Sequence, residues 1–225
     1  ELARTEQGQA VFVSGEPGIG KSRLIQVLAE KAAEKPHTLL WLQCSPYHQN
    51  SAFYPVIQRL SRAAGFLKDD TDEQRLGKLE ALLADNGEDV PSVCALYAEL
   101  LSIDTHGRYP TPELAPQQRK DLMLQTLVNR LTLMSKRSPV LLIIEDAHWI
   151  DPSTSELLER VLARIAGLSV MVVITHRTDW SAPLAAGNGH ATTIAIGHLS
   201  RPQVSQLVQA IICREPDARL LDDIA

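Results

Sequence analysis

Eight residues near the start of the chain have the types and spacing that bind phosphate. They are Gly15-Glu16-Pro17-Gly18-Ile19-Gly20-Lys21-Ser22, and they fit the pattern G-x-x-x-x-G-K-[ST] at every specified position. The glycines permit backbone conformations closed to residues with a Cβ atom, so that consecutive N–H groups can point at phosphate oxygens. The lysine ammonium then reaches the terminal phosphates, and the serine hydroxyl takes a place on Mg²⁺. The alternative is a glycine turn that fits the pattern by coincidence.

The residues on either side of this loop predict the elements that must hold it. Residues 10–13 are an apolar run typical of a short buried strand, and from Ser22 onward apolar residues recur at helical spacing. A strand, a glycine loop and a helix together present the helix N-terminus, with its partial positive charge, to a bound anion. This order of elements favours the phosphate-binding interpretation.

A second candidate pair follows the most uniformly apolar run in the chain, residues 140–144, which is typical of a central parallel strand covered on both faces. The run ends in Glu145 and Asp146. Beside a phosphate loop such acids form the second nucleotide signature, Walker B, in which one carboxylate holds Mg²⁺ and the other orients or deprotonates the attacking water. Because adjacent strand residues point to opposite faces, both can serve only if the strand ends there and the backbone turns. The alternative is a buried strand that merely finishes in acids.

Three further polar residues lie near these signatures in the sequence. Asp151, followed by proline, has the pattern of a helix N-cap, which explains it without catalysis. His148 is close enough to touch the site, with packing or a hydrogen bond to the loop as the alternative. Arg177 follows a strand predicted over residues 169–174, where a guanidinium can approach the γ-phosphate and report its presence. The alternative for Arg177 is a surface salt bridge.

Composition and length indicate an ordinary globular chain. Hydrophobic residues make up 44% and charged residues 22% of the 225 residues, and the net charge of −5 argues against broad nucleic-acid binding. Cys44, Cys94 and Cys213 are widely spaced, which predicts reduced core residues and a cytoplasmic protein. No apolar run approaches the roughly 20 residues of a membrane span. Because the first residue is not Met, we expect a fragment of a larger multidomain protein.

The remaining apolar patterns arrange these candidates in one domain over residues 1–225. Strands over residues 10–13, 38–42, 140–144, 169–174 and 192–196 belong to a core of residues 8–45 and 138–213. The strand, helix, strand order at the start predicts a parallel crossover unit. Helical periodicity over about residues 53–134 predicts a helical insertion between the second and third strands.

With both signatures in place, the chain resembles the P-loop ATPases of the AAA+ and STAND groups. It looks most like the ATPase module that follows class III adenylate or guanylate cyclase domains in large bacterial signalling proteins, and similar modules occur in large helix-turn-helix transcription activators. The resemblance is carried by residues 13–24, by residues 44–55 (CSPYHQNSAFYP) and by residues 145–152 (EDAHWIDP). It covers nearly the whole chain.

The resemblance implies a three-layer αβα sandwich with a parallel five-stranded sheet of order 5-1-4-3-2. It also implies Mg²⁺-dependent binding and slow hydrolysis of ATP as a regulatory switch. The implied phosphate contacts come from Gly15, Glu16, Pro17, Gly18, Ile19, Gly20, Lys21, Ser22 and Arg23; the Mg²⁺ ligands are Ser22 and Glu145, and the catalytic residues are Asp146, Lys21 and Arg177. The implied partners are ATP or ADP and the effector and sensor domains of the same chain, without membrane or direct nucleic-acid contact. A homo-oligomer is left open.

Two departures from the family pattern keep alternatives open. AAA+ proteins usually have Asp then Glu at the second signature, whereas this chain has Glu145 then Asp146, so the activating carboxylate is one methylene shorter and turnover should be slow. The glycine-arginine segment that normally contacts adenine does not occur in these residues. A slow ATPase, a module that holds ATP or ADP without hydrolysis, and an interaction domain with a vestigial site all remain hypotheses. Any cyclase reaction would belong to another domain.

Overall fold

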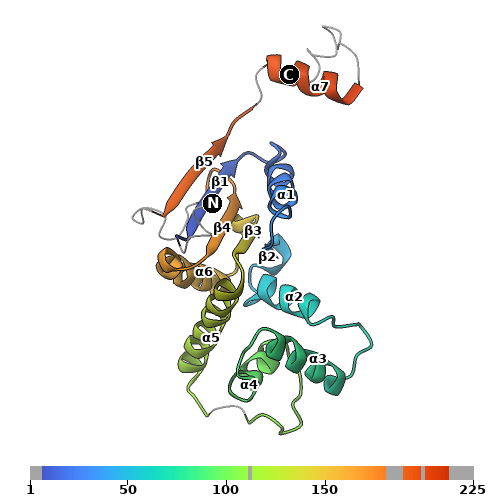
Figure 1. The fold of residues 1–225 in the computed structure, drawn as a ribbon, viewed down its shortest axis with the longest axis vertical. Helices are drawn as coiled ribbons and strands as arrows, with labels where there is room; N and C mark the ends of the chain where they lie inside the picture. The colour runs from blue at the N-terminus through green and yellow to red at the C-terminus, as the bar shows by residue number, and fades with distance from the viewer. Residues whose placement is uncertain (1–6, 111–112, 181–189, 199–200, 213–225) are drawn as a thin grey trace.

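The computed structural model describes residues 7–110, 113–180, 190–198 and 201–212. At its centre is a sheet of five parallel strands in the order β2-β3-β4-β1-β5, with helices on both faces (Figure 1). The strands are β1 (Gln9–Gly15), β2 (Thr38–Gln43), β3 (Val140–Glu145), β4 (Val170–His176) and β5 (Ala191–Ile196). Counted from the opposite edge, this is the predicted order 5-1-4-3-2, and the predicted fold class is confirmed.

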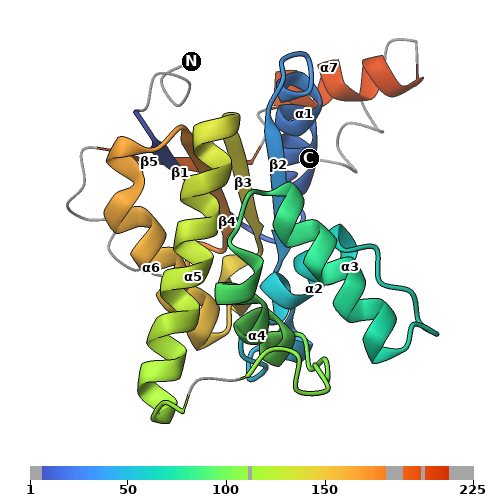
Figure 2. The ribbon, with the colours of Figure 1, turned by 60° about the horizontal axis from the view of Figure 1, so that its bottom comes forward.

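The helices of the insertion separate β2 from β3 along the chain, as predicted. They are α2 (Tyr54–Ala63), α3 (Asp72–Asp85), α4 (Val90–Leu100) and α5 (Pro116–Arg137); the others are α1 (Lys21–Ala32), α6 (Pro152–Arg164) and α7 (Arg201–Ile212). Short 3-10 turns lie at η2 (Pro46–His48), η3 (Ala147–Trp149) and η4 (Ile165–Gly167). Figure 2 shows α5 and α6 side by side on the sheet, whereas α3 and α4 pack with each other away from it.

The side chains of β3 alternate between two hydrophobic cores, one on each face of the sheet. Leu141 and Ile143 pack with Ile25 of α1 in the smaller core. Leu142 and Ile144 belong to the larger core, which also holds the inward residues of α5 and α6. All six residues of β3 are buried, as expected for a central parallel strand. With both faces covered, the carboxyl edge of the sheet is left for ligands.

Two strands are longer than their apolar runs indicate. β1 continues through Ser14 to Gly15, and β4 continues through Thr175 to His176; Ser14 pairs with His176 in the parallel ladder. Backbone pairing with neighbouring strands, rather than side-chain polarity, decides where these strands end. The extra residues bring polar side chains to the carboxyl edge of the sheet.

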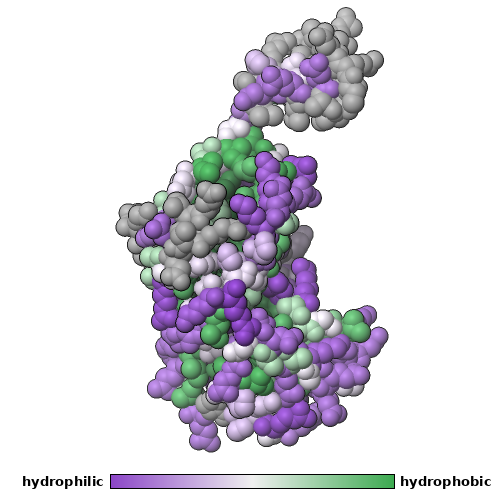
Figure 3. All heavy atoms as spheres, viewed as in Figure 1, coloured by the Kyte–Doolittle hydropathy of each residue, from purple (hydrophilic) through white to green (hydrophobic). Residues whose placement is uncertain are grey.

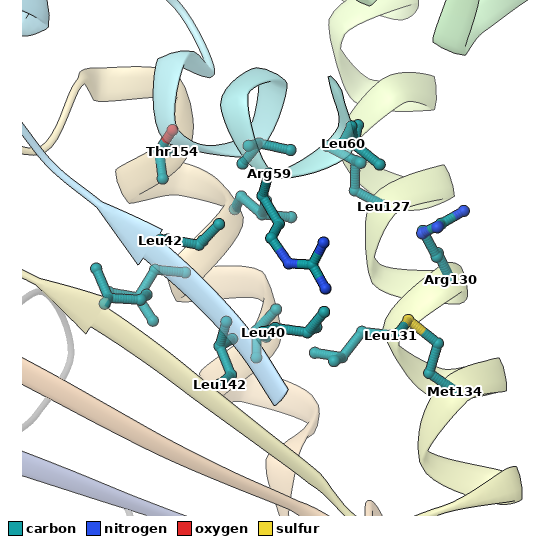
Figure 4. Close-up of a pocket in the computed structure, with 15 residues that line it drawn as sticks. Leu40, Leu42, Arg59, Leu60, Leu127, Arg130, Leu131, Met134, Leu142 and Thr154 are labelled. Carbon is teal, nitrogen blue, oxygen red and sulfur yellow. The ribbon is translucent and has the colours of Figure 1, made fainter. Parts of the chain in front are cut away.

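The larger core contains an apolar cavity of about 90 Å³ between the sheet and helices α2, α5 and α6. Figure 4 shows the guanidinium of Arg59 among the leucines that line it. Arg59 Nη2 donates to the carbonyl of Leu39 at 3.3 Å, which satisfies one acceptor of the edge strand β2. Burial, followed by the like charges of Arg130 and Arg62, lowers the pKa of Arg59. Arg130 itself pairs with the buried Glu88.

The described cysteines are core residues, as predicted. Cys44 and Cys94 are buried free thiols, and Cys213 lies outside the described residues. Burial, with a smaller contribution from Asp151 and Asp146, raises the pKa of the Cys44 thiol to about 12, so this thiol stays protonated. No helix in the described part of the chain is long and apolar enough to cross a membrane.

The surface is largely hydrophilic in the view of Figure 3, with hydrophobic side chains gathered where Figure 1 places β5 and the start of α1. Leu24 of α1 and Ile194 of β5 are each 45% exposed. The four central residues of β5 are all exposed, so this edge strand is less covered than the rest of the sheet.

Candidate functional site

The predicted site residues leave the carboxyl edge of three neighbouring strands. β1 ends at Gly15, β3 ends at Glu145, and β4, which ends at His176, lies between them. The phosphate loop, the acidic pair and Arg177 therefore emerge in the same direction. An open cleft of about 420 Å³ lies at this edge, lined by Pro17, Gly18, Gly20, Lys21, Ser22, Arg23, Asp146, His148, Trp149 and Arg177.

The glycines of the loop serve two different purposes. Gly18 (φ 78°) and Gly20 (φ 103°) take the left-handed conformation that favours glycine. Gly15 does not; a Cβ there would lie 2.9 Å from Cγ2 of Ile19 and 3.0 Å from the carbonyl oxygen of Ile196. The prediction of a special backbone conformation therefore holds for two of the three glycines. Gly15 is required for close packing between the loop and β5.

Lys21 is held against its own loop at the start of α1. Its Nζ donates to the carbonyl oxygens of Gly15 at 2.7 Å and Glu16 at 2.9 Å, and the residue is only 8% exposed. An ammonium has three donors, so one remains after these two bonds. Ser22 is exposed at the same helix end, where the first N–H groups of α1 have no partner within the helix. The carboxylate of Glu16 accepts from Thr178 Oγ1 at 3.0 Å, which ties the loop to the segment after β4.

The acidic pair lies where the strand ends and the chain turns, the condition for both carboxylates to serve one site. Asp146 has a φ of 56° directly after β3. Glu145 is 6% exposed and accepts from Trp41 Nε1 at 2.9 Å. Asp146 lines the cleft and accepts from Gln43 Nε2 at 3.2 Å, and its backbone N–H donates to Thr175 Oγ1 at 3.0 Å. The sequence predicted none of these three partners, which lie on the neighbouring strands β2 and β4.

The side chain of Trp149 contacts both Arg177 and His148, the two candidate residues not yet described. The guanidinium carbon of Arg177 lies 5.3 Å from the ring centroid of Trp149, a cation–π contact. The ring of His148 lies 4.9 Å from the same tryptophan, centroid to centroid, tilted by 45°. Within the described residues Arg177 makes no salt bridge. No local pattern in the sequence predicts this role of Trp149.

The charges around the cleft favour an anion. Its lining has three cationic side chains, Lys21, Arg23 and Arg177, against the single carboxylate of Asp146. Burial lowers the pKa of His148, an effect that Asp146 opposes, so the imidazole is neutral at pH 7. No cluster of three or more metal-binding side chains occurs in the part of the chain that the structure describes. The Ser22 hydroxyl and the Asp146 carboxylate line the cleft and are oxygen ligands of the kind that Mg²⁺ takes together with phosphate and water, whereas Glu145, which accepts from Trp41, is not among the residues that line it.

Asp151 is an N-cap, as predicted, and it lies outside the cleft lining. Its Oδ1 accepts from the backbone N–H groups of Ser153 at 3.1 Å and Thr154 at 3.0 Å, at the start of α6. The same oxygen accepts from the backbone N–H of Phe53 at 2.9 Å. This buried carboxylate therefore links the loop after the acidic pair to the start of the insertion.

Comparisons with known proteins show the family of this chain. The chain matches the family described as AAA ATPase domain over residues 1–174. It is 28% identical over 215 residues to an uncharacterised protein of Rhizobium meliloti (strain 1021), covering 95% of this chain and 20% of that protein. The chain thus spans about a fifth of the length of this relative.

Two solved structures are among those similar to this chain. One is a Signal Transduction ATPase with Numerous Domains (STAND) protein with a tetratricopeptide repeat sensor from Pyrococcus horikoshii, with TM-score 0.44 and 16% identity over 93% of this chain and 24% of that one. The other is the Drosophila ORC bound to AT-rich DNA and Cdc6, with TM-score 0.38 and 11% identity over 88% of this chain and 51% of that one. Because the family match spans most of its residues, this chain belongs to the AAA ATPase domain family.

Proposed function

We propose that this domain binds ATP with Mg²⁺ and hydrolyses it slowly, so that the bound nucleotide acts as a regulatory switch. The observation that carries the proposal is the cleft in which the phosphate loop, Asp146 and Arg177 come together at one edge of the sheet. Membership of the AAA ATPase domain family supports the nucleotide-binding part. The excess of cationic side chains suits the triphosphate.

In this proposal the loop and the first turn of α1 bind the phosphates through their N–H groups. Lys21 and Arg177 offset the negative charge of the β- and γ-phosphates. Ser22 and Glu145 would hold Mg²⁺, which neutralises further phosphate charge when it is bound. The two carbonyl contacts of Lys21 fix its ammonium inside the loop, so little side-chain freedom is lost when the phosphates arrive.

Asp146 is the residue that we assign to the attacking water. Its carboxylate orients the water and accepts a proton as the water oxygen attacks the γ-phosphorus, while the bond from that phosphorus to the bridging oxygen breaks and ADP leaves. Gln43 holds this carboxylate by donating to Oδ2. The shorter reach of Asp compared with Glu favours slow turnover. The alternative function is a module that holds ATP or ADP without hydrolysing it.

The wider role is also a proposal. The relative from Rhizobium meliloti is about five times as long as the segment it shares with this chain, which supports a place in a multidomain protein. We infer that the nucleotide state is read by effector and sensor domains of the same chain, in a cytoplasmic signalling protein like the cyclase-linked modules that the sequence resembles. A homo-oligomer would fit the same scheme.

The first test is calorimetric binding of Mg²⁺-ATP and Mg²⁺-ADP to the wild-type protein and to Lys21→Ala. Loss of a charged hydrogen-bond donor to phosphate should weaken ATP binding by about 10- to 100-fold. Lys31→Ala removes the same charge from the far end of α1, away from the cleft, and should leave affinity unchanged. Equal affinity in wild type and Lys21→Ala would contradict the proposed site.

A product assay on the same samples separates the two functions. Asp146→Asn should abolish ADP formation while nucleotide binding persists. If the wild-type protein binds ATP but forms no ADP in single-turnover conditions, the non-hydrolysing module is the better description. If neither nucleotide binds or raises the melting temperature, the domain is not a nucleotide switch.

A further inference from the structure

His148 has two ring nitrogens that the fold leaves without partners. Both Nδ1 and Nε2 are shielded from solvent and neither makes a hydrogen bond within the described residues. A neutral imidazole has one N–H donor and one acceptor, and leaving such groups unpaired in the interior lowers stability. An unsatisfied buried group therefore calls for an explanation, and a ligand that supplies the missing partner is one.

The position of His148 indicates which ligand that is. The residue lines the cleft, and the charged groups that act on its ring are Asp146, Arg177, Lys21 and Asp179. Lys21 and Arg177 are the cations assigned above to the terminal phosphates, and Asp146 is the carboxylate assigned to the attacking water. The imidazole thus lies at the end of the cleft where ATP differs from ADP.

Trp149 restricts how the imidazole can move. Its ring contacts both the imidazole of His148, 4.9 Å away between centroids, and the guanidinium of Arg177, whose carbon lies 5.3 Å from the ring centroid. Contact with Trp149 therefore keeps His148 beside the cleft, and neither ring nitrogen makes a hydrogen bond in the described part of the chain. A side chain held in this way can turn a ring nitrogen toward an incoming anion without breaking a hydrogen bond.

We propose that His148 donates an N–H to the γ-phosphate of bound ATP and thereby sets the preference of the site for ATP over ADP. This inference rests on the proposed function, since it deepens the role of the same cleft. In this proposal the neutral imidazole of His148, in addition to the cationic Lys21 and Arg177, distinguishes bound ATP from bound ADP.

The test compares β,γ-imido-ATP, which keeps the γ-phosphate and resists hydrolysis, with ADP, both as Mg²⁺ complexes. Calorimetry gives the affinity of each for wild type, His148→Leu and His148→Gln. His148→Leu should weaken imido-ATP binding by about 10- to 100-fold, the usual range for a hydrogen bond to a charged group, and leave ADP binding unchanged. His148→Gln keeps an N–H donor and should recover part of the lost affinity.

His37→Leu is the matched control. His37 also has a buried ring nitrogen, Nε2, without a partner, but it lies just before β2, at the opposite edge of the sheet. This variant should change neither affinity. The melting temperature of unliganded His148→Leu should equal or exceed that of wild type, because two unsatisfied nitrogens are removed.

The possible results distinguish a failure of the His148 contact from a failure of the proposed nucleotide site. If His148→Leu loses affinity for both nucleotides equally, or for neither, the γ-phosphate contact is wrong while the proposed nucleotide site stands. If wild type binds neither nucleotide, the proposed function fails and this inference fails with it. A lower melting temperature together with an equal loss of both affinities would identify His148 as a packing residue.

Discussion

Replacing Asp151 should be among the most destabilising changes that leave the nucleotide cleft intact. This carboxylate is 1% exposed and accepts four hydrogen bonds. Two come from the first turn of α6, one from the Thr154 hydroxyl at 2.6 Å, and one from the backbone of Phe53. Phe53 has a φ of 57°, a conformation that costs energy for a bulky residue and that this bond helps to hold.

The magnitude follows from what Asp151→Ala leaves behind. Losing an N-cap costs about 1 kcal/mol, and leaving a buried donor unsatisfied costs about 1–3 kcal/mol. The buried donors here are the N–H of Phe53 and the N–H and hydroxyl of Thr154, and some of them will regain water. The expected loss in the free energy of unfolding is therefore about 3–5 kcal/mol, a large share of the 5–15 kcal/mol typical of a domain. Asp151→Asn keeps the Oδ1 acceptor and should lose only about 1–2 kcal/mol.

Urea unfolding followed by circular dichroism measures these differences. The exposed cap of α3 provides the control: Thr71 forms a capping box with Gln74, and Thr71→Ala should cost only about 1 kcal/mol. The folded Asp151→Ala protein should bind nucleotide as wild type does, because Asp151 does not line the cleft. A loss no larger than that of Thr71→Ala would refute the reasoning, since the bonds to Phe53 and Thr154 would then add nothing.

Other predictions concern pH and two glycines. Hydrogen bonds from Lys78 and a backbone N–H hold the pKa of Asp70 in the folded protein below its ordinary value of 3.8. The stability that this carboxylate contributes is therefore complete above pH 3.8 and is lost as the pH falls from there through the lower pKa of the folded state. Asp70→Asn should therefore lower the melting temperature at pH 7 and flatten its fall below about pH 4 in scanning calorimetry, and an unchanged acid profile would count against this. Gly77→Ala, in the open interior of α3, should raise stability by about 0.5–1 kcal/mol. In Gly8→Ala the new Cβ would collide with the carbonyl oxygen of Ile165, so the free energy of unfolding should fall by about 1–3 kcal/mol. Equal urea midpoints for these two variants would contradict the close packing of Gly8 against Ile165.

Features of the site that depend on neighbours in sequence were predictable. The phosphate loop, the acidic pair at the end of β3 and the cap at Asp151 are each defined within a few residues of chain, and hydrophobic periodicity locates the strands that carry them. The strand order came from the resemblance to P-loop ATPases, because periodicity shows that strands exist and says little about which ones pair.

The partners of the acidic pair were not predictable, for a physical reason. Trp41 and Glu145 are 104 residues apart, and Gln43 and Asp146 are 103 apart. They meet because β2 pairs with β3 in a register that sets Gln43 opposite Glu145. No local pattern fixes a parallel register across an insertion of four helices. The same holds for the unsatisfied nitrogens of His148, which depend on what the folded chain places around the ring.

Three single hydrogen bonds connect the parts of this site that a switch would have to move together. Glu16 accepts from Thr178, the residue after Arg177, so a shift of the phosphate loop acts on the segment that carries the guanidinium. The backbone N–H of Asp146 donates to Thr175 Oγ1 near the end of β4, the strand that Arg177 follows. The third bond runs from the backbone N–H of Phe53, at the start of the insertion, to Asp151 Oδ1. A ligand shifts a conformational equilibrium only by its differential affinity for the two states. If ATP and ADP set different states here, as we propose, the difference must therefore begin at the γ-phosphate and pass through bonds such as these.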